Sequence, residues 1–172
     1  MSDATTEQSE VTRYEELRQQ ANRALWTIDR QIRRLREPVG DDLFVLGPIS
    51  DAEWLIIQLD RFLCLARRVN ELSAGALEKA INAFLVAIPE LRNARNVIAH
   101  LDEYVVGGGR NPNVRPSQLS THVIGDDEMT YGGFALGLAA ALAASHELFA
   151  AIREHPPQSY RRAVQAAKDR QA

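Results

Sequence analysis

The segment 91–104 carries the side chains best suited to chemistry. Arg95, Asn96 and His100 occur within six residues, and on a helix Asn96 and His100 lie one turn apart. An imidazole that titrates near neutral pH can take or give a proton. A guanidinium can stabilise the charge that develops on a phosphate, and an amide can orient either group. Such a set suffices to cleave RNA without a metal ion, because the ribose 2′-hydroxyl itself attacks the adjacent phosphate.

Five further residues are candidates for supporting this chemistry. Arg92 lies on the same polar helix face, and Arg110 and Arg115 follow on a loop that contains glycine and proline, where they can bind an RNA backbone. Asp102 and Glu103 bring negative charge close to the same place. They either orient Arg or His side chains or mark a protein that does not cleave RNA. The alternative for the whole polar face is that it is only solvated.

The sequence gives no sign of a metal or cofactor site. His122, His146 and His155 are scattered and share no ligand spacing. The single Cys64 excludes a cysteine-based zinc site and an internal disulfide, and its position in an apolar helix favours a place in the core. The run 107–109 consists of three glycines, but no Gly-Lys-Ser/Thr follows it, so it is not a P-loop. We expect no metal and no cofactor.

The spacing of the central residues carries a resemblance. The chain has 18 Arg, 4 His and 7 Asn, so chance predicts about 0.4 matches to Arg-x4-His but roughly 0.02 when Asn must follow the Arg. The run 95–100, Arg-Asn-Val-Ile-Ala-His, resembles the Arg-x4–6-His motif of HEPN domains, which commonly have Asn directly after the Arg. HEPN domains are small helical bundles, often of four or five helices, with the motif late in the bundle.

The resemblance implies a metal-independent endoribonuclease of a toxin–antitoxin, phage-defence or RNA-processing system. By position, Arg95 would bind phosphate, His100 would be the acid and base, and Asn96 would position them. It also implies a homodimer that brings two motifs together, and it allows an antitoxin or another protein partner. HEPN toxins paired with nucleotidyltransferase antitoxins usually have Tyr two residues after the His, whereas this chain has Asp102, which argues against that partnership. Two alternatives stay open: a catalytically silent HEPN-like module that binds RNA, a nucleotide or a protein, and a structural protein with an accidental match.

A helical bundle has to position these residues. The first helix has one apolar stripe and stops at Pro38 and Gly40, and the second begins with a capping box, Ser50 to Glu53, and a staple between Ile49 and Trp54. Trp26 beside the first stripe is expected in the core, with a dimer surface as the alternative. The first stripe comprises Tyr14, Leu17, Ala21, Leu25, Ile28, Ile32 and Leu35, and the second comprises Leu55, Ile56, Leu59, Phe62, Leu63, Ala66 and Val69.

The later elements follow from proline and glycine positions. Ser73 is expected to cap a third helix, and Pro89 should kink it or start a fourth that continues to about Tyr104. The segments 121–124 and 129–131 can form a small β-hairpin, and a last long helix is expected over 134–153 before two prolines. Its small residues at three- and four-residue spacing, Gly133, Gly137, Ala141 and Ala144, allow close packing in the core or across a dimer.

Length and composition agree with one globular domain. The chain has 172 residues, of which 45% are hydrophobic and 25% charged. Its net charge of −3 excludes a protein that holds nucleic acid by bulk positive charge. No stretch is apolar enough to cross a membrane, and the polar N-terminus does not resemble a signal peptide, so we expect a cytoplasmic protein. We predict an all-α, up-and-down bundle of four to five helices over residues 11–153, a disordered leader over 1–10 and a basic tail over 154–172 that can form a short helix.

Overall fold

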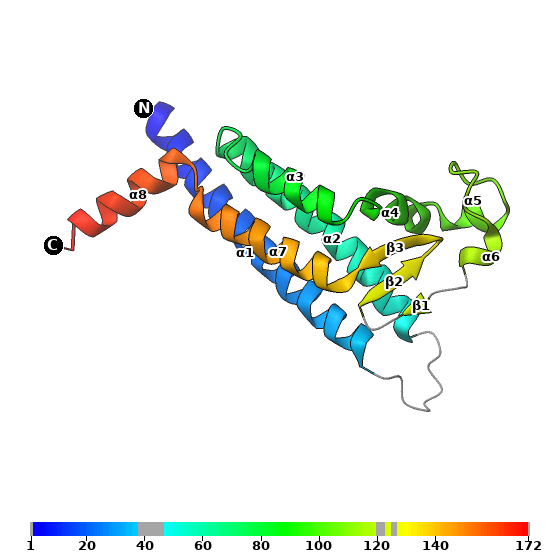
Figure 1. Ribbon diagram of the computed structural model, residues 1–172. Coiled ribbons are helices and arrows are strands. Elements are labelled where there is room, and N and C mark those ends of the chain that lie inside the picture. The colour runs from blue at the N-terminus through cyan, green and yellow to red at the C-terminus, as the bar shows by residue number, and fades with distance from the viewer. Residues whose placement is uncertain (1, 38–46, 120–122, 125–126, 172) are drawn as a thin grey trace.

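The structure is a computed structural model that describes residues 2–37, 47–119, 123–124 and 127–171. Within these residues the chain forms eight helices and one small three-stranded antiparallel sheet (Figure 1). The prediction of an all-α bundle with a small β insertion before the last long helix is confirmed. No helix in the described part is both long and apolar enough to span a lipid bilayer.

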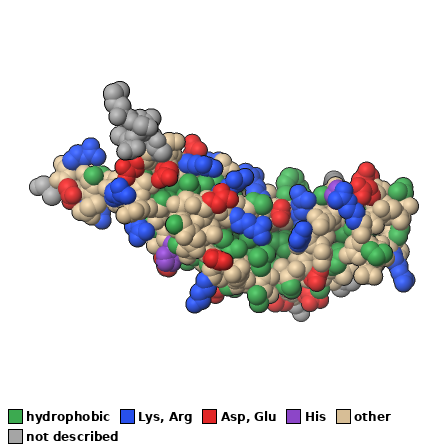
Figure 2. All heavy atoms as spheres, turned by 90° about the horizontal axis from the view of Figure 1, so that it is seen from above, with side chains coloured by type: hydrophobic (Ala, Val, Ile, Leu, Met, Phe, Trp, Pro, Cys, Tyr) green, Lys and Arg blue, Asp and Glu red, His purple; other side chains and the backbone are tan. Residues whose placement is uncertain are grey.

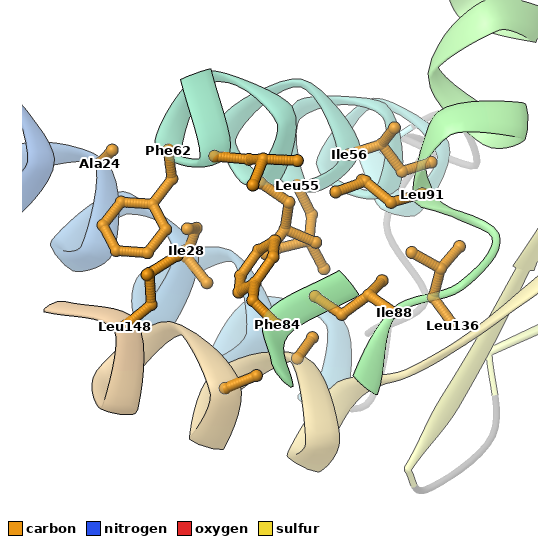
Figure 3. Packing of buried hydrophobic residues seen from close by; sticks show 14 of the residues in the cluster. Ala24, Ile28, Leu55, Ile56, Phe62, Phe84, Ile88, Leu91, Leu136 and Leu148 are labelled. Atoms are coloured by element: carbon orange, nitrogen blue, oxygen red, sulfur yellow. The ribbon is translucent and has the colours of Figure 1, made fainter. Parts of the chain in front are cut away.

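Four helices form the bundle. α1 (Ser2–Arg36) and α2 (Gly47–Leu72) lie side by side along most of the molecule, α7 (Leu138–Glu154) packs beside α1, and α3 (Glu78–Ala87) packs against α7 and α2 (Figure 1). Every apolar position predicted for the second helix is buried, and so is the first stripe apart from the half-buried Leu17. Figure 3 shows Phe62 of α2 and Phe84 of α3 facing the centre, where their ring centroids are 6.1 Å apart.

The N-terminal end differs from the prediction of a disordered leader. α1 already begins at Ser2, because residues 2–37 contain no proline or glycine that would stop the helix from extending. The tail does form a helix, α8 (Gln158–Asp169), which projects past the end of the bundle (Figure 1). Arg162 of α8 pairs with Glu7 of α1 at 3.3 Å, and Tyr160 packs edge-on against Tyr14. Contacts between α1 and α8 therefore hold the two ends of the chain together.

The start of α2 corrects the predicted capping box. α2 begins at Gly47, before Ser50, because a proline at 48 is well accommodated in a first helical turn. The carboxylate of Glu53 does not return to the helix start but accepts a hydrogen bond of 2.6 Å from Tyr131. Trp54 is 53% exposed, so it does not close a buried staple. Cys64 is exposed, because it lies outside the apolar stripe of α2, and the prediction that it belongs to the core is wrong.

The turn before α3 is built differently from the prediction. Ser73 does not cap α3, because its hydroxyl donates to the carbonyl of His155 at 2.8 Å. The residue before the helix is Leu77, whose N–H donates to the side-chain oxygen of Asn70 at 2.7 Å. Asn70 near the end of α2 therefore ties the start of α3 to α2.

The sheet revises the boundary of the last long helix. β1 (Val123–Ile124), β2 (Glu128–Tyr131) and β3 (Phe134–Gly137) form a meander, and α7 begins only at Leu138. Residues 134–137 are a strand, not a helix, because two glycines with φ of +58° and +85° form a tight turn that pairs Tyr131 with Phe134. Asp127 accepts the N–H groups of residues 138 and 139 and so caps α7.

Some residues singled out in the sequence have a different burial from the one predicted, and others lie outside the residues that the structure describes. Of the predicted stripe of small residues, Ala141 and Ala144 are buried and belong to the core, whereas Gly133 is exposed and Gly137 half-buried, and both precede α7. The helix stop at 38 and 40, residues 121–122 of the predicted hairpin with His122, and its turn at 125–126 lie outside the described residues. Trp26, expected in the core, is 62% exposed on α1.

Candidate functional site

α4 presents the polar residues of the motif. Pro89 separates α3 from α4 (Leu91–Ala99), as the sequence predicted. Leu91, Ala94 and Val97 recur at three-residue spacing and are buried, and α4 packs against α2. Burial of this stripe turns the opposite face of α4, which carries the two asparagines at 93 and 96, toward solvent.

His100 stands where the predicted single helix breaks. α4 ends at Ala99 and α5 (Leu101–Val105) follows, while His100 adopts φ −128° and ψ 33° between them. Its N–H still donates to the carbonyl oxygens of Asn96 and Val97 at 3.2 and 3.3 Å. The break therefore leaves the backbone anchored and sets the imidazole at the junction of two short helices.

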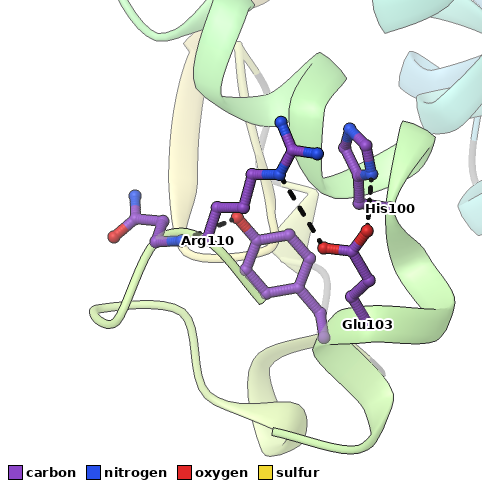
Figure 4. A network of polar contacts seen from close by, with 5 residues as sticks. His100, Glu103 and Arg110 are labelled. Carbon is purple, nitrogen blue, oxygen red and sulfur yellow. Dashed lines mark hydrogen bonds and ion pairs between the residues drawn. The ribbon is translucent and has the colours of Figure 1, made fainter. Parts of the chain in front are cut away.

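Glu103 holds the imidazole from one side. Nδ1 of His100 lies 3.0 Å from Oε1 of Glu103, one turn further along α5 (Figure 4). The other carboxylate oxygen, Oε2, lies 3.9 Å from Nε of Arg110. When Nδ1 carries the proton that it shares with the carboxylate, Nε2 is left as a proton acceptor. The carboxylate thus fixes the imidazole and draws a guanidinium toward the same place.

A tight loop brings Arg110 to this position. Gly107, with φ +78°, follows the C-cap of α5. The N–H groups of Gly107 and Gly108 donate to the carbonyls of Tyr104 and Glu103, which is the Schellman arrangement. Gly109 lies flat on the Tyr104 ring, since a Cβ there would come within 2.0 Å of it. The Tyr104 hydroxyl accepts the N–H of residue 111 at 3.1 Å. The ring of Tyr104 therefore sets the path of the backbone on both sides of residue 110.

These elements enclose one small pocket of about 220 Å³. Its lining residues each carry a polar side-chain group and come from α4, the junction, α5 and the loop. The lining residues are Asn93, Asn96, His100, Tyr104, Arg110 and Asn111. An imidazole, a guanidinium and three amides around a space of this size can bind an anionic group such as one phosphate with its neighbouring ribose.

Several predicted site residues do not line this pocket. Arg95 turns to α2, where its Nε lies 3.5 Å from Oδ2 of Asp60, because it sits about 140° around the helix axis from His100. Arg92, Asp102 and Arg115 are exposed and are not among the lining residues. Glu103 does not line the pocket either, although it contacts His100 and Arg110. The structure thus brings together Asn96, His100, Glu103 and Arg110, and it separates Arg95 from them.

Three lining residues were not among the predicted site residues. Asn93 precedes Asn96 by three positions, so its place on the polar face was readable from the sequence. Tyr104 was expected as the approximate end of the fourth helix; it is buried, but its hydroxyl reaches the loop. No pattern in the sequence indicated Asn111 as a site residue, because only the fold of the loop brings it back to Tyr104.

The surrounding surface carries mixed charge. On the face shown in Figure 2, Lys and Arg side chains occur in small groups separated by Asp and Glu, without a continuous basic stripe. No group of three or more His, Cys, Asp or Glu side chains suited to a metal ion occurs among the described residues. Comparisons of the chain with models of known protein families, with curated proteins and with solved structures found no match.

Proposed function

We propose that the chain is a metal-independent endoribonuclease. The observation that carries the proposal is one pocket lined by both His100 and Arg110. Glu103 does not line the pocket, but its carboxylate lies 3.0 Å from the imidazole of His100 with one oxygen and 3.9 Å from the guanidinium of Arg110 with the other. A proton acceptor and a phosphate-binding cation are the two groups that transesterification of RNA requires. The run 95–100 adds its resemblance to the HEPN motif.

The groups act on RNA in one displacement. Nε2 of His100 takes the proton from a ribose 2′-hydroxyl, and the 2′ oxygen forms a bond to the adjacent phosphorus. Arg110 stabilises the extra negative charge on the phosphate oxygens, and Asn96 donates hydrogen bonds that orient the strand. The bond from phosphorus to the 5′ oxygen then breaks, and that oxygen takes a proton from water. The hydroxide that remains takes the proton from the His100 imidazolium, which restores the neutral imidazole. The products are a 2′,3′-cyclic phosphate and a 5′-hydroxyl.

Arg95 does not have the phosphate-binding role in a single chain that its position in the motif implies. Because Arg95 pairs with Asp60 and does not line the pocket, the phosphate-binding cation of a single chain is Arg110. We also propose a homodimer, in which the Arg95 of one copy contributes to a site shared with the other. RNA as substrate, a cytoplasmic location, a toxin, defence or RNA-processing role and an antitoxin or other protein partner belong to the same proposal.

One observation favours a second candidate, an RNA- or nucleotide-binding module that does not cleave. One oxygen of the Glu103 carboxylate already lies 3.0 Å from Nδ1 of His100, and the other lies 3.9 Å from Nε of Arg110. A phosphate entering the pocket therefore approaches a negative charge that offsets part of the attraction of Arg110. In this candidate the pocket binds a ligand while the imidazole performs no proton transfer.

One assay separates the two candidates. Purified protein is incubated with mixed single-stranded RNA in EDTA, and the ends of any fragments are identified. The enzyme leaves 2′,3′-cyclic phosphate ends, and the activity is lost in His100→Ala and strongly reduced in Arg110→Ala. Arg115→Ala is the matched control, because Arg115 is an exposed loop arginine outside the pocket. Intact RNA with retained binding supports the second candidate, and cleavage that survives His100→Ala refutes the proposed site.

The same preparation tests the remaining roles. Arg95→Ala removes activity if Arg95 serves a shared site, and it leaves activity unchanged if Arg110 is sufficient. Light scattering gives the mass of the assembly. A strictly monomeric protein that cleaves RNA would refute the shared site while leaving the pocket of His100 and Arg110 in place.

A further inference from the structure

A second pocket lies on α1 and α7, away from the motif. It has a volume of about 390 Å³, within the range of roughly 300–1,000 Å³ that small-ligand pockets occupy. Trp26 forms part of it with 62% of its surface exposed, although the sequence predicted a core residue. The lining residues are Asn22, Arg23, Leu25, Trp26, Asp29, Arg33 and His146.

The charges around Trp26 leave this pocket positive. Arg33 is neutralised by Asp29 at 2.6 Å. Arg30 does not line the pocket, but its guanidinium lies over the Trp26 ring, with its central carbon 5.5 Å from the ring centroid. Arg23 and Arg30 form no ion pair with any residue in the described ranges, so two positive charges flank the indole.

An exposed indole beside uncompensated arginines fits one kind of ligand. An apolar protein surface does not fit over Trp26, because it would remove the hydration of Arg23 and Arg30 without giving them an acidic partner. A nucleobase instead stacks on the indole in place of the Arg30 guanidinium, which turns to a phosphate beside the base, while Arg23 contacts the phosphate on the other side. The amide of Asn22 adds a hydrogen-bonding group within reach of a base edge.

We propose that the Trp26 pocket binds single-stranded nucleic acid by stacking one base on the indole and pairing the flanking phosphates with Arg23 and Arg30. This site is separate from the pocket of His100 and does not rest on cleavage there. Its partner is a strand of RNA or DNA with an unpaired base, since in a duplex the base faces are already covered by stacking. The charge complementarity is local and agrees with a net charge of −3 for the chain.

Intrinsic fluorescence reports on the stacking directly. The chain has two tryptophans, so the substitution Trp54→Phe leaves Trp26 as the sole indole. The probe is an eight-nucleotide single-stranded DNA, which keeps bases and phosphates but lacks the 2′-hydroxyl and cannot be cleaved by 2′-hydroxyl attack. We expect saturable quenching by this oligonucleotide and none by an abasic strand of the same length. Equal quenching by the abasic strand, or no quenching, overturns the proposal.

Substitutions then assign the binding to the pocket. With a labelled oligonucleotide and fluorescence anisotropy as readout, Trp26→Ala weakens binding by roughly 5- to 100-fold. Trp54→Ala is the matched control, because Trp54 is the other exposed tryptophan. Arg23→Gln lowers the dependence of log Kd on log salt by about 0.7, whereas Arg67→Gln, at an exposed position of α2, leaves it unchanged. Binding by Trp26→Ala that equals binding by Trp54→Ala refutes the site.

Further experiments distinguish a nucleic-acid strand from a free nucleotide as the ligand, and they test the Trp26 site separately from the endoribonuclease. If a mononucleotide quenches Trp26 with the same Kd as the eight-nucleotide strand, the ligand is a free nucleotide, and the proposal that the pocket binds a nucleic-acid strand is overturned. Binding of an RNA strand is measured with the His100→Ala variant, because this variant is expected not to cleave the RNA. Quenching of Trp26 without any RNA cleavage by the unsubstituted protein refutes only the endoribonuclease, and cleavage without quenching refutes only the Trp26 site.

Discussion

Replacing Gly109 by alanine tests how the loop presents Arg110 to the pocket. A Cβ at residue 109 would lie 2.0, 2.2 and 2.5 Å from three carbons of the Tyr104 ring. Ordinary carbon contacts begin at about 3.5 Å, so the loop has to move by roughly 1 Å or more. Tyr104 is 3% exposed and cannot yield easily. The displacement therefore falls on the loop and carries Arg110 with it.

The magnitude follows from two effects. Overpacking costs about 1–3 kcal/mol of unfolding free energy, and breaking the hydrogen bond of 3.1 Å between the residue 111 N–H and the Tyr104 hydroxyl adds about 0.5–1.5 kcal/mol. For a chain of this size we expect a loss of several degrees in Tm. A catalytic group displaced by about 1 Å costs roughly 100-fold in rate. RNA cleavage by Gly109→Ala should fall by that factor while the bundle stays folded.

The neighbouring glycine is the matched control. A Cβ at Gly108 would meet its nearest atom, the carbonyl oxygen of Glu103, at 3.6 Å, which is an ordinary contact. Gly108→Ala should therefore keep both Tm and cleavage close to those of the original protein. Circular dichroism melts and the EDTA cleavage assay measure the two quantities. If Gly109→Ala matches Gly108→Ala in both, the loop does not depend on close packing against Tyr104 and the reasoning is refuted.

Three further predictions concern the bundle and its sheet. Gly133→Ala, at φ +85°, should lower the unfolding free energy by about 1–2 kcal/mol in urea denaturation, while Gly137→Ala, whose Cβ would meet only an ordinary contact at 3.6 Å, serves as control. Tyr131→Phe removes the hydrogen bond of 2.6 Å to the Glu53 carboxylate and should cost about 1.5–3 kcal/mol in the same experiment. Burial raises the pKa of Tyr14 to about 12; since the folded state favours the protonated phenol, its contribution is complete below about pH 10 and is lost as the pH rises toward 12. Thermal melts over this range should show a shallower decline for Tyr14→Phe than for the original protein, and equal declines would contradict the assignment.

Regular periodicity made much of the bundle predictable from the sequence. The buried stripes of α1 and α2, the new helix after Pro89 and the helix in the tail all follow from local rules of spacing and backbone geometry. Local rules failed where neighbours decide. The pair of glycines at 132–133 and strand pairing override the helical pattern of 134–137, and Trp26 and Cys64 are exposed although both stand next to apolar stripes.

The sequence by itself determined which residue types are available for proton transfer and phosphate binding, and it placed Asn96 and His100 one helical turn apart. Only the tertiary structure decided which cation joins them. A regular helix wheel assumes one unbroken axis, whereas the break at His100 redirects the chain and the loop folds back over Tyr104. As a result Glu103 contacts His100, three residues before it, and Arg110, seven residues after it, while Arg95 is held by Asp60 of another helix. Pairing of side chains from separate segments depends on packing, and no local spacing rule encodes it.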